Sequence, residues 1–232
     1  MPREDALRSR FVLGAEMVSG VIFVLLLIGS AVLRYPAVFT EGGIASVLVP
    51  VVILLLYGAA AVRARLQSEG AVREALRQGA IFGLIAGALF VVHLPVEHFV
   101  RMPRRIDMAS TLAVMGLAFS LFGTAGLVAA KRTGCFRLGI LAGVWCAMIS
   151  MVMTCLMGFA LLFAIMPRLE RNFQAEYLRR GGHDPEAFAV LNTLESATSH
   201  LIQAPILALI FGSVGGFIGW GLVRRRSPGR WA

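Results

Sequence analysis

Six long apolar runs constrain this chain more than any other feature of its sequence. They cover residues 11–33, 43–63, 79–100, 109–130, 136–166 and 201–223. Each run can cross a hydrocarbon core about 30 Å thick, which takes about 20 residues of helix. The runs are continuous and rich in Gly and Ala, whereas the strands of a membrane barrel alternate apolar and polar residues over about ten positions. Because a helix satisfies its own backbone groups in lipid, the sequence predicts an all-α membrane protein with six transmembrane helices.

Composition agrees with this class. Hydrophobic residues make up 58% of the chain and charged residues 15%, whereas charge is about a quarter of an ordinary soluble domain. The fifth run is 31 residues long, more than an upright span needs. We therefore expect its helix to tilt, kink or project from the membrane before Pro167 stops it.

The positions of the basic residues predict the orientation of the chain in the membrane, because short loops on the cytoplasmic side are enriched in Lys and Arg. Fourteen lie in the two tails and in the second and fourth loops: Arg3, Arg8, Arg10, Arg63, Arg65, Arg73, Arg77, Lys131, Arg132, Arg137, Arg224, Arg225, Arg226 and Arg230. Eight lie on the opposite side: Arg34, Arg101, Arg104, Arg105, Arg168, Arg171, Arg179 and Arg180. This bias predicts a multi-pass protein of the bacterial cytoplasmic (inner) membrane with both termini in the cytoplasm.

A cleaved signal peptide is the alternative for the first run. PREDALRSR followed by MVSGVIFVLLLIGSA resembles a basic region, an apolar region and a small-residue cleavage site. Cleavage would leave five spans and an outside N-terminus. Glu16 argues against it, because it lies inside an apolar run that begins at Phe11 and is longer than the apolar region of a usual signal peptide.

The net charge of +9 does not indicate nucleic-acid binding, because the charge is divided among four separate cytoplasmic segments. Anionic lipid headgroups at the cytoplasmic arginines are the predicted partners. A homo-oligomer or a partner in a membrane complex stays open. Cys135, Cys146 and Cys155 are predicted to be packing residues, since the last two lie about 13 Å apart along one helix and no CxxC motif is present.

A short glycine motif occurs twice, which indicates an internal repeat. GLIAG at 83–87 recurs as GILAG at 139–143, and the helices that follow end alike, in AGLVAAKR at 125–132 and GLVRRR at 221–226. We interpret the chain as three helical hairpins, with hairpins 3–4 and 5–6 duplicated. Glycines four residues apart share a helix face and let another backbone approach. The predicted packing positions are Gly83, Gly87, Gly139 and Gly143.

Residues 167–200 are predicted to form an amphipathic helical segment on the extracytoplasmic side. Apolar residues four apart define one stripe, Gly181 and Gly182 break the helix, and Asp184 and Pro185 start a second helix as N-cap and first residue. The two apolar stripes consist of Leu169, Phe173 and Tyr177, and of Phe188, Leu191 and Leu194. The segment either caps the bundle or lies on the membrane surface. A partner-docking surface or a lid is the alternative.

The chain from about Gly83 onward resembles, in layout, an uncharacterised family of small bacterial membrane proteins known as a domain of unknown function. The shared features are GLIAG, AGLVAAKR, the 167–200 segment and GLVRRR. They span about three-fifths of the chain, and the N-terminal hairpin departs from the pattern. This resemblance implies a small polytopic membrane protein and brings no activity or catalytic residues with it.

The stretch HLPVEHF at 93–99 places ionisable side chains at the end of the third run. His93 and Glu97 are four residues apart and share a helix face. With Arg101, four residues further on, they would form a polar ladder facing the bundle interior, and Pro95 would free a backbone carbonyl nearby. HxxxEH is one residue longer than the HxxEH zinc-protease motif, so we do not expect a protease.

Other readings of these groups stay open. Haem b needs one axial histidine from each of two helices, which His93 or His98 could supply with His200. A metal site, or a proton or substrate relay, is a further possibility, since ionisable groups inside a membrane are functional candidates. Glu16, inside the first span, could pair with an arginine at the cytoplasmic end.

No catalytic motif is present, and GSVGGFIG at 212–219 lacks the preceding strand of a dinucleotide-binding site. The expected function is therefore that of a structural, accessory-subunit or transport-associated membrane protein rather than an enzyme. A haem- or metal-binding redox subunit that uses His93, His98 or His200 is the alternative. No cofactor is predicted under the first reading.

Overall fold

The computed structural model describes residues 2–67, 70–100, 102–182 and 184–226, and only the backbone of residues 2–14, 67, 172 and 226. The described chain is helical, and its elements are α1 (Pro2–Arg34), α2 (Val38–Gln67), α3 (Gly70–Phe99), α4 (Arg104–Thr133), α5 (Phe136–Arg180) and α6 (Pro185–Arg226). All six are long and apolar enough to cross a membrane. The prediction of an all-α protein with six membrane-capable helices is confirmed.

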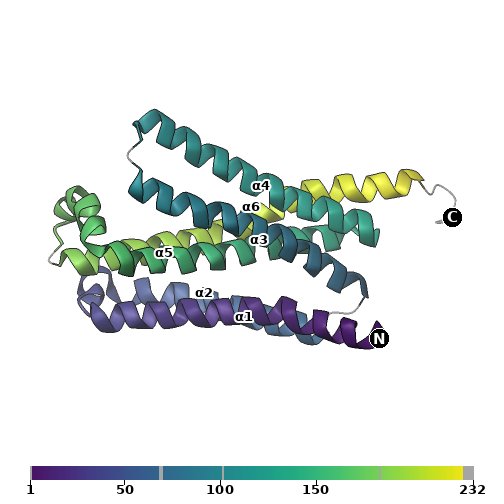
Figure 1. The fold of residues 1–232 in the computed structure, drawn as a ribbon, viewed down its shortest axis with the longest axis horizontal. Coiled ribbons are helices and arrows are strands. Elements are labelled where there is room, and N and C mark those ends of the chain that lie inside the picture. The colour runs from purple at the N-terminus through teal and green to yellow at the C-terminus, as the bar shows by residue number, and fades with distance from the viewer. Residues whose placement is uncertain (1, 68–69, 101, 183, 227–232) are drawn as a thin grey trace.

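Helix α5 forms the centre of the bundle. It packs against α3, α4 and α6, while α1 and α2 lie side by side along one flank, α1 against α5 and α2 against α6 (Figure 1). The most apolar stretch of α5 is 56% buried, against 28% in each of the other helices. The remaining helices therefore expose most of their apolar surface, as expected of helices that face lipid.

The two ends of the bundle differ. Helix α1 starts and α6 ends at one of them, and the connection between α5 and α6 lies at the other (Figure 1). We call the second the junction end. Hydrogen bonds to both α6 and the connection before it help to hold α2 against the bundle. The hydroxyl of Tyr57 donates to the carbonyl of Leu201 at 2.6 Å, and the carboxylate of Glu41 accepts from the backbone N–H of Asp184 at 3.0 Å.

Glycines of α3 allow close contact with α5. A Cβ atom added to Gly83 would lie 2.8 Å from the carbonyl oxygen of Cys146, and one on Gly87 would lie 3.1 Å from Cβ of Met153. A larger residue at Gly83 would therefore meet backbone, which cannot move aside as a flexible side chain can.

The corresponding glycines of α5 contact α4 and α6. A Cβ atom on Gly143 would lie 2.8 Å from Cα of Gly212, and one on Gly139 would lie 2.7 Å from the carbonyl oxygen of Gly126. All four glycines that the repeat singled out therefore lie at helix contacts. Such small residues replace side-chain packing by close backbone contact.

The expected kink of the fifth helix is present just before Pro167, but Pro167 does not end the helix. Helix α5 continues to Arg180 and bends at Ile165, where φ is −131° and ψ is 27°. Proline lacks an N–H and its ring collides with the carbonyl four residues earlier, so the helix must bend or end at this point. Packing against the rest of the bundle supports the bent form. The helix predicted to start at Pro185 continues without a break into the sixth apolar run, so the two form one helix, α6.

The predicted break at the junction end is confirmed. Gly181 ends α5 with a φ of 69°, and the carboxylate of Asp184 caps α6 by accepting from the N–H of Ala187 at 3.0 Å. The rings of Tyr177 and Phe188 meet edge to face with centroids 5.7 Å apart. Members of both predicted apolar stripes are buried: Leu169, Phe188, Leu191 and Leu194. The stripes therefore pack onto the bundle, which favours the capping interpretation.

Candidate functional site

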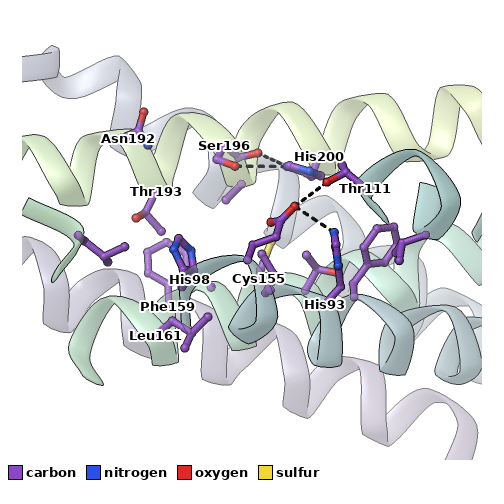
Figure 2. Close-up of a pocket in the computed structure, with 18 of the residues that line it drawn as sticks. His93, His98, Thr111, Cys155, Phe159, Leu161, Asn192, Thr193, Ser196 and His200 are labelled. Atoms are coloured by element: carbon purple, nitrogen blue, oxygen red, sulfur yellow. Dashed lines mark hydrogen bonds and ion pairs between the residues drawn. The ribbon is translucent and has the colours of Figure 1, made fainter. Parts of the chain in front are cut away.

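Four of the predicted polar residues line a single cavity of about 300 Å³ between α3, α4, α5 and α6 (Figure 2). They are His93, Glu97, His98 and His200. Leu169 and Phe173, from the bent part of α5, also line the cavity. The cavity therefore lies toward the junction end of the bundle.

Glu97 connects α3 to α4. Its Oε1 atom accepts a hydrogen bond from the hydroxyl of Thr111 at 2.9 Å and lies 2.9 Å from Nε2 of His93. The histidine contact is close enough for an ion pair, but the ring N–H is not aligned with the oxygen as a hydrogen bond requires. Since the side chain of His93 is only 10% exposed, this nitrogen is a buried polar atom at the cavity wall.

The local sequence explains why these groups meet. His93 and Glu97 are one helical turn apart on α3, so their side chains point in the same direction. Pro95 lies inside α3 between them. Because it has no N–H, it cannot donate to the carbonyl of Val91, which leaves a backbone acceptor beside the pair. The predicted ladder thus has its first two members in contact, while its third, Arg101, lies outside the described residues.

Helices α5 and α6 add hydroxyl and amide groups that the sequence analysis did not single out. Thr154 comes from α5. Asn192, Thr193 and Ser196 come from α6 (Figure 2). One signal was present in the sequence: Asn192, Ser196 and His200 are spaced by four, which places a polar stripe on one face of a helix. We missed it because residues 167–200 were assigned to a segment outside the membrane.

His200 has a defined hydrogen-bond arrangement. Its Nδ1 atom lies 2.7 Å from the carbonyl oxygen of Ser196. A carbonyl can only accept, so Nδ1 carries the proton, and in the neutral ring Nε2 then offers a lone pair. His200 therefore acts as an acceptor through Nε2 when it is neutral.

A second, more polar cavity of about 700 Å³ adjoins the first. Glu97 and His98 line both cavities, and the second adds Asp107, Arg168 and Arg171. The guanidinium of Arg168 lies 5.3 Å from the ring centroid of Phe99. The two carboxylates of this second cavity balance its two arginines in formal charge. The two cavities adjoin at Glu97 and His98.

Glu16 lies elsewhere. It lines a separate cavity of about 80 Å³ between α1, α3 and α5, with Ala80 and Ile149 among the other lining residues. Within the described part of the chain, it makes no ion pair, so its predicted arginine partner is not among the contacts seen. The structure does not bring Glu16 together with His93 or His200.

The side chains around the inner cavity limit the kinds of ligand that it can bind. Across the described ranges, no three His, Cys, Asp or Glu side chains are grouped closely enough to hold a metal ion. The cavity does combine a carboxylate, three histidines and several hydroxyl groups with apolar walls that include Phe90 and Phe159. Such a combination suits binding of a small polar molecule or transfer of a proton.

Comparisons with protein-family models, curated proteins and solved structures find no match. The layout resemblance to a family of unknown function stays a prediction. Function must therefore be argued from the residues of the cavity.

Proposed function

We propose that this protein is a transport-associated membrane protein that binds a small polar solute in the cavity between α3, α4, α5 and α6. The main observation in support is that ionisable and hydroxyl groups from separate helices line one cavity in an otherwise apolar bundle. A purely structural polar seam would bring such groups into mutual contact without space between them. Here His93 and Glu97 touch, yet about 300 Å³ remains beside them.

Burial of polar groups gives this proposal its physical basis. A polar atom without an aligned partner is costly away from water, by about 1–3 kcal/mol. Nε2 of His93 is such an atom. Water or a solute in the cavity would satisfy it, so the cavity is better suited to being filled than to being empty.

A binding experiment on protein in lipid nanodiscs tests the proposal. Saturation-transfer NMR against small amines, carboxylates, alcohols and sugars should detect binding by at least one class. The matched control is Ala197→Phe, which places a ring in the cavity at a position that is 8% exposed. Binding that the filled variant abolishes supports the proposal. If no class binds, or if Ala197→Phe binds equally well, the cavity is not a solute site.

The haem alternative rests on one observation: His93 of α3 and His200 of α6 line the same cavity. Nδ1 of His200 is held by a backbone carbonyl, the arrangement common among metal-ligating histidines. Nε2 of His93, however, faces Glu97 at 2.9 Å. The absorption spectrum of purified protein decides between the two functions, because bound haem gives a Soret band and an empty solute site does not.

We propose for the arrangement in the membrane that the helices form three hairpins, with α3–α4 and α5–α6 duplicated, and that both termini face the cytoplasm of a bacterial inner membrane. Support comes from the paired glycine motifs at 83–87 and 139–143 and from the arginine and lysine bias. The junction end, with residues 167–200, would then be extracytoplasmic.

Anionic lipid headgroups are the partners we propose for the basic residues at the other end, such as Lys131 at the end of α4. A second copy or another membrane subunit could cover the exposed apolar faces of α1 and α2. Vesicle binding at increasing salt tests the lipid contribution, since headgroup attraction is screened.

A further inference from the structure

The hydroxyl groups of Thr154 and Thr193, which line the inner cavity, offer acceptors rather than donors. Thr154 donates its proton to the carbonyl of Ser150 at 2.8 Å, and Thr193 donates to the carbonyl of Ala189 at 2.9 Å. A hydroxyl has one proton and two lone pairs. Both oxygens can therefore only accept from a molecule in the cavity.

The other groups add to this imbalance. Nε2 of His200 presents a lone pair in the neutral ring, because Nδ1 is engaged with the carbonyl of Ser196. The hydroxyl of Thr111 is directed to Glu97 at 2.9 Å. Glu97 itself is acceptor-only when ionised. The donors at the cavity wall are the amide of Asn192, the hydroxyl of Ser196 and the ring N–H groups of His93 and His98.

Charge points in the same direction. Glu97 carries the one carboxyl group among the described side chains that line the inner cavity, and no Lys or Arg lines it there. A carboxylate in a low-dielectric site favours a nearby positive charge. The rings of Phe90, Phe159 and Phe173 supply faces that attract cations.

From these observations we infer that the solute of this cavity is a small organic ammonium ion with N–H donors, held by Glu97. Its N–H groups donate to the carboxylate and to the oxygens of Thr154 and Thr193, while its apolar part contacts the phenylalanine rings. A cavity of about 300 Å³ accommodates a molecule of this class. This inference rests on the proposed function and names the substrate class of the same site.

The outer cavity is compatible with entry of such a cation. Arg168 and Arg171 bring positive charge to its wall, and Asp107 and Glu97 balance it. Arg168 also stacks on Phe99, with its guanidinium carbon 5.3 Å from the ring centroid. The formal charges on the wall of the outer cavity therefore sum to zero for the entering cation. Glu97 is the carboxylate that lines both cavities.

Four probes of similar size test the inference on protein in nanodiscs: n-butylammonium, tetramethylammonium, n-butanol and butyrate. We expect n-butylammonium to bind most tightly, because it alone combines positive charge with N–H donors. Tetramethylammonium carries the charge without the donors and should bind more weakly. Glu97→Gln should weaken binding of n-butylammonium by about tenfold, the loss typical of one charge-assisted contact. The matched control Glu16→Gln, in a separate cavity, should leave it unchanged.

The outcomes separate the two levels of the argument. If butyrate or n-butanol binds more tightly than n-butylammonium and Ala197→Phe abolishes that binding, the ammonium inference is overturned and the solute site stands. Unchanged n-butylammonium affinity in a folded Glu97→Gln variant also overturns the inference. If none of the four probes binds, the ammonium inference is overturned, and the solute site is decided by the wider screen that includes sugars. Thermal unfolding of each variant shows that it remains folded.

Discussion

Oε1 of Glu97 lies 2.9 Å from the hydroxyl oxygen of Thr111, so a carboxylate near the end of α3 accepts a hydrogen bond from the start of α4. The hydrogen bond joins α3 directly to α4. Arg101, in the loop between these two helices, is outside the described residues. The hydrogen bond holds the carboxylate at the boundary between the two cavities. A double-mutant cycle measures what this link contributes.

We expect Thr111→Val and Glu97→Ala to show a coupling of about 1 kcal/mol in the free energy of unfolding in detergent. Glu97→Gln should cost less, because its amide oxygen still accepts from Thr111. Thr198→Val is the matched control, since the Thr198 hydroxyl donates to the Leu194 carbonyl within its own helix. Additive losses from the two substitutions would show that the contact contributes nothing to stability.

Gly143→Ala should destabilise the protein, because the new Cβ would lie 2.8 Å from Cα of Gly212 and 3.2 Å from the carbonyl oxygen of Ala208. Overpacking of this kind costs about 1–3 kcal/mol. Gly116→Ala is the control: a Cβ there meets nothing within 4 Å, and alanine favours the helix by about 1 kcal/mol in soluble hosts. Thermal unfolding in detergent should therefore shift in opposite directions. A Gly143→Ala variant as stable as the parent contradicts the close-packing account.

The orientation is tested by thiol labelling in intact bacterial cells, after Cys135, Cys146 and Cys155 are replaced by alanine. A membrane-impermeant reagent should modify Arg179→Cys, at an exposed position near the end of α5, and should spare Ala71→Cys near the start of α3. The two positions lie at opposite ends of the bundle. The reverse labelling pattern would place both termini outside.

The junction end should respond to acid. A hydrogen bond from Arg180 is the main cause that lowers the pKa of Glu176; desolvation opposes it, and the charges of Arg180 and Arg179 add to the lowering. Arg180 also contacts Glu195 of α6 at 3.2 Å, so the network links α5 to α6. Because the folded pKa lies below the ordinary value of about 4.3, the network stabilises the junction fully above that pH and loses its contribution as the pH falls through the lowered pKa.

Hydrogen-exchange protection factors of the first turns of α6 measure this effect. They should fall in acid for the parent protein, and Arg180→Gln should lower them at neutral pH. Arg179→Gln is a matched control, since Arg179 contacts Glu176 of its own helix at 3.2 Å and does not join α5 to α6. An equal effect of both substitutions would show that the link between the helices is unimportant.

Local features of the site were predictable because they depend on spacing along one helix. The contact between His93 and Glu97 follows from a separation of four residues. Asp184 and Gly181 could be placed as cap and break from their residue types alone. These features need no knowledge of how the helices pack.

Features that depend on packing between helices were not predictable. Thr111 contacts Glu97 only because α4 returns beside α3, and Thr154 lines the cavity only because α5 crosses both. Pro167 was expected to end α5, yet tertiary contacts retain a bent helix through it. Neither the cavity nor its boundary at Glu97 is encoded in any short motif.

Reactivity of two cysteines one helical turn apart on α5 tests the central claim, that the bundle encloses a solute-accessible polar cavity in the membrane. Thr154→Cys lies on the cavity wall, and Ser150→Cys is the control at a position that is 0% exposed and absent from that wall. In membranes from the cysteine-free background, a small hydrophilic thiol reagent should modify Thr154→Cys much faster, and Ala197→Phe should suppress the reaction. Equal, slow labelling at both positions would contradict the claim and leave His93 and Glu97 as a closed structural seam.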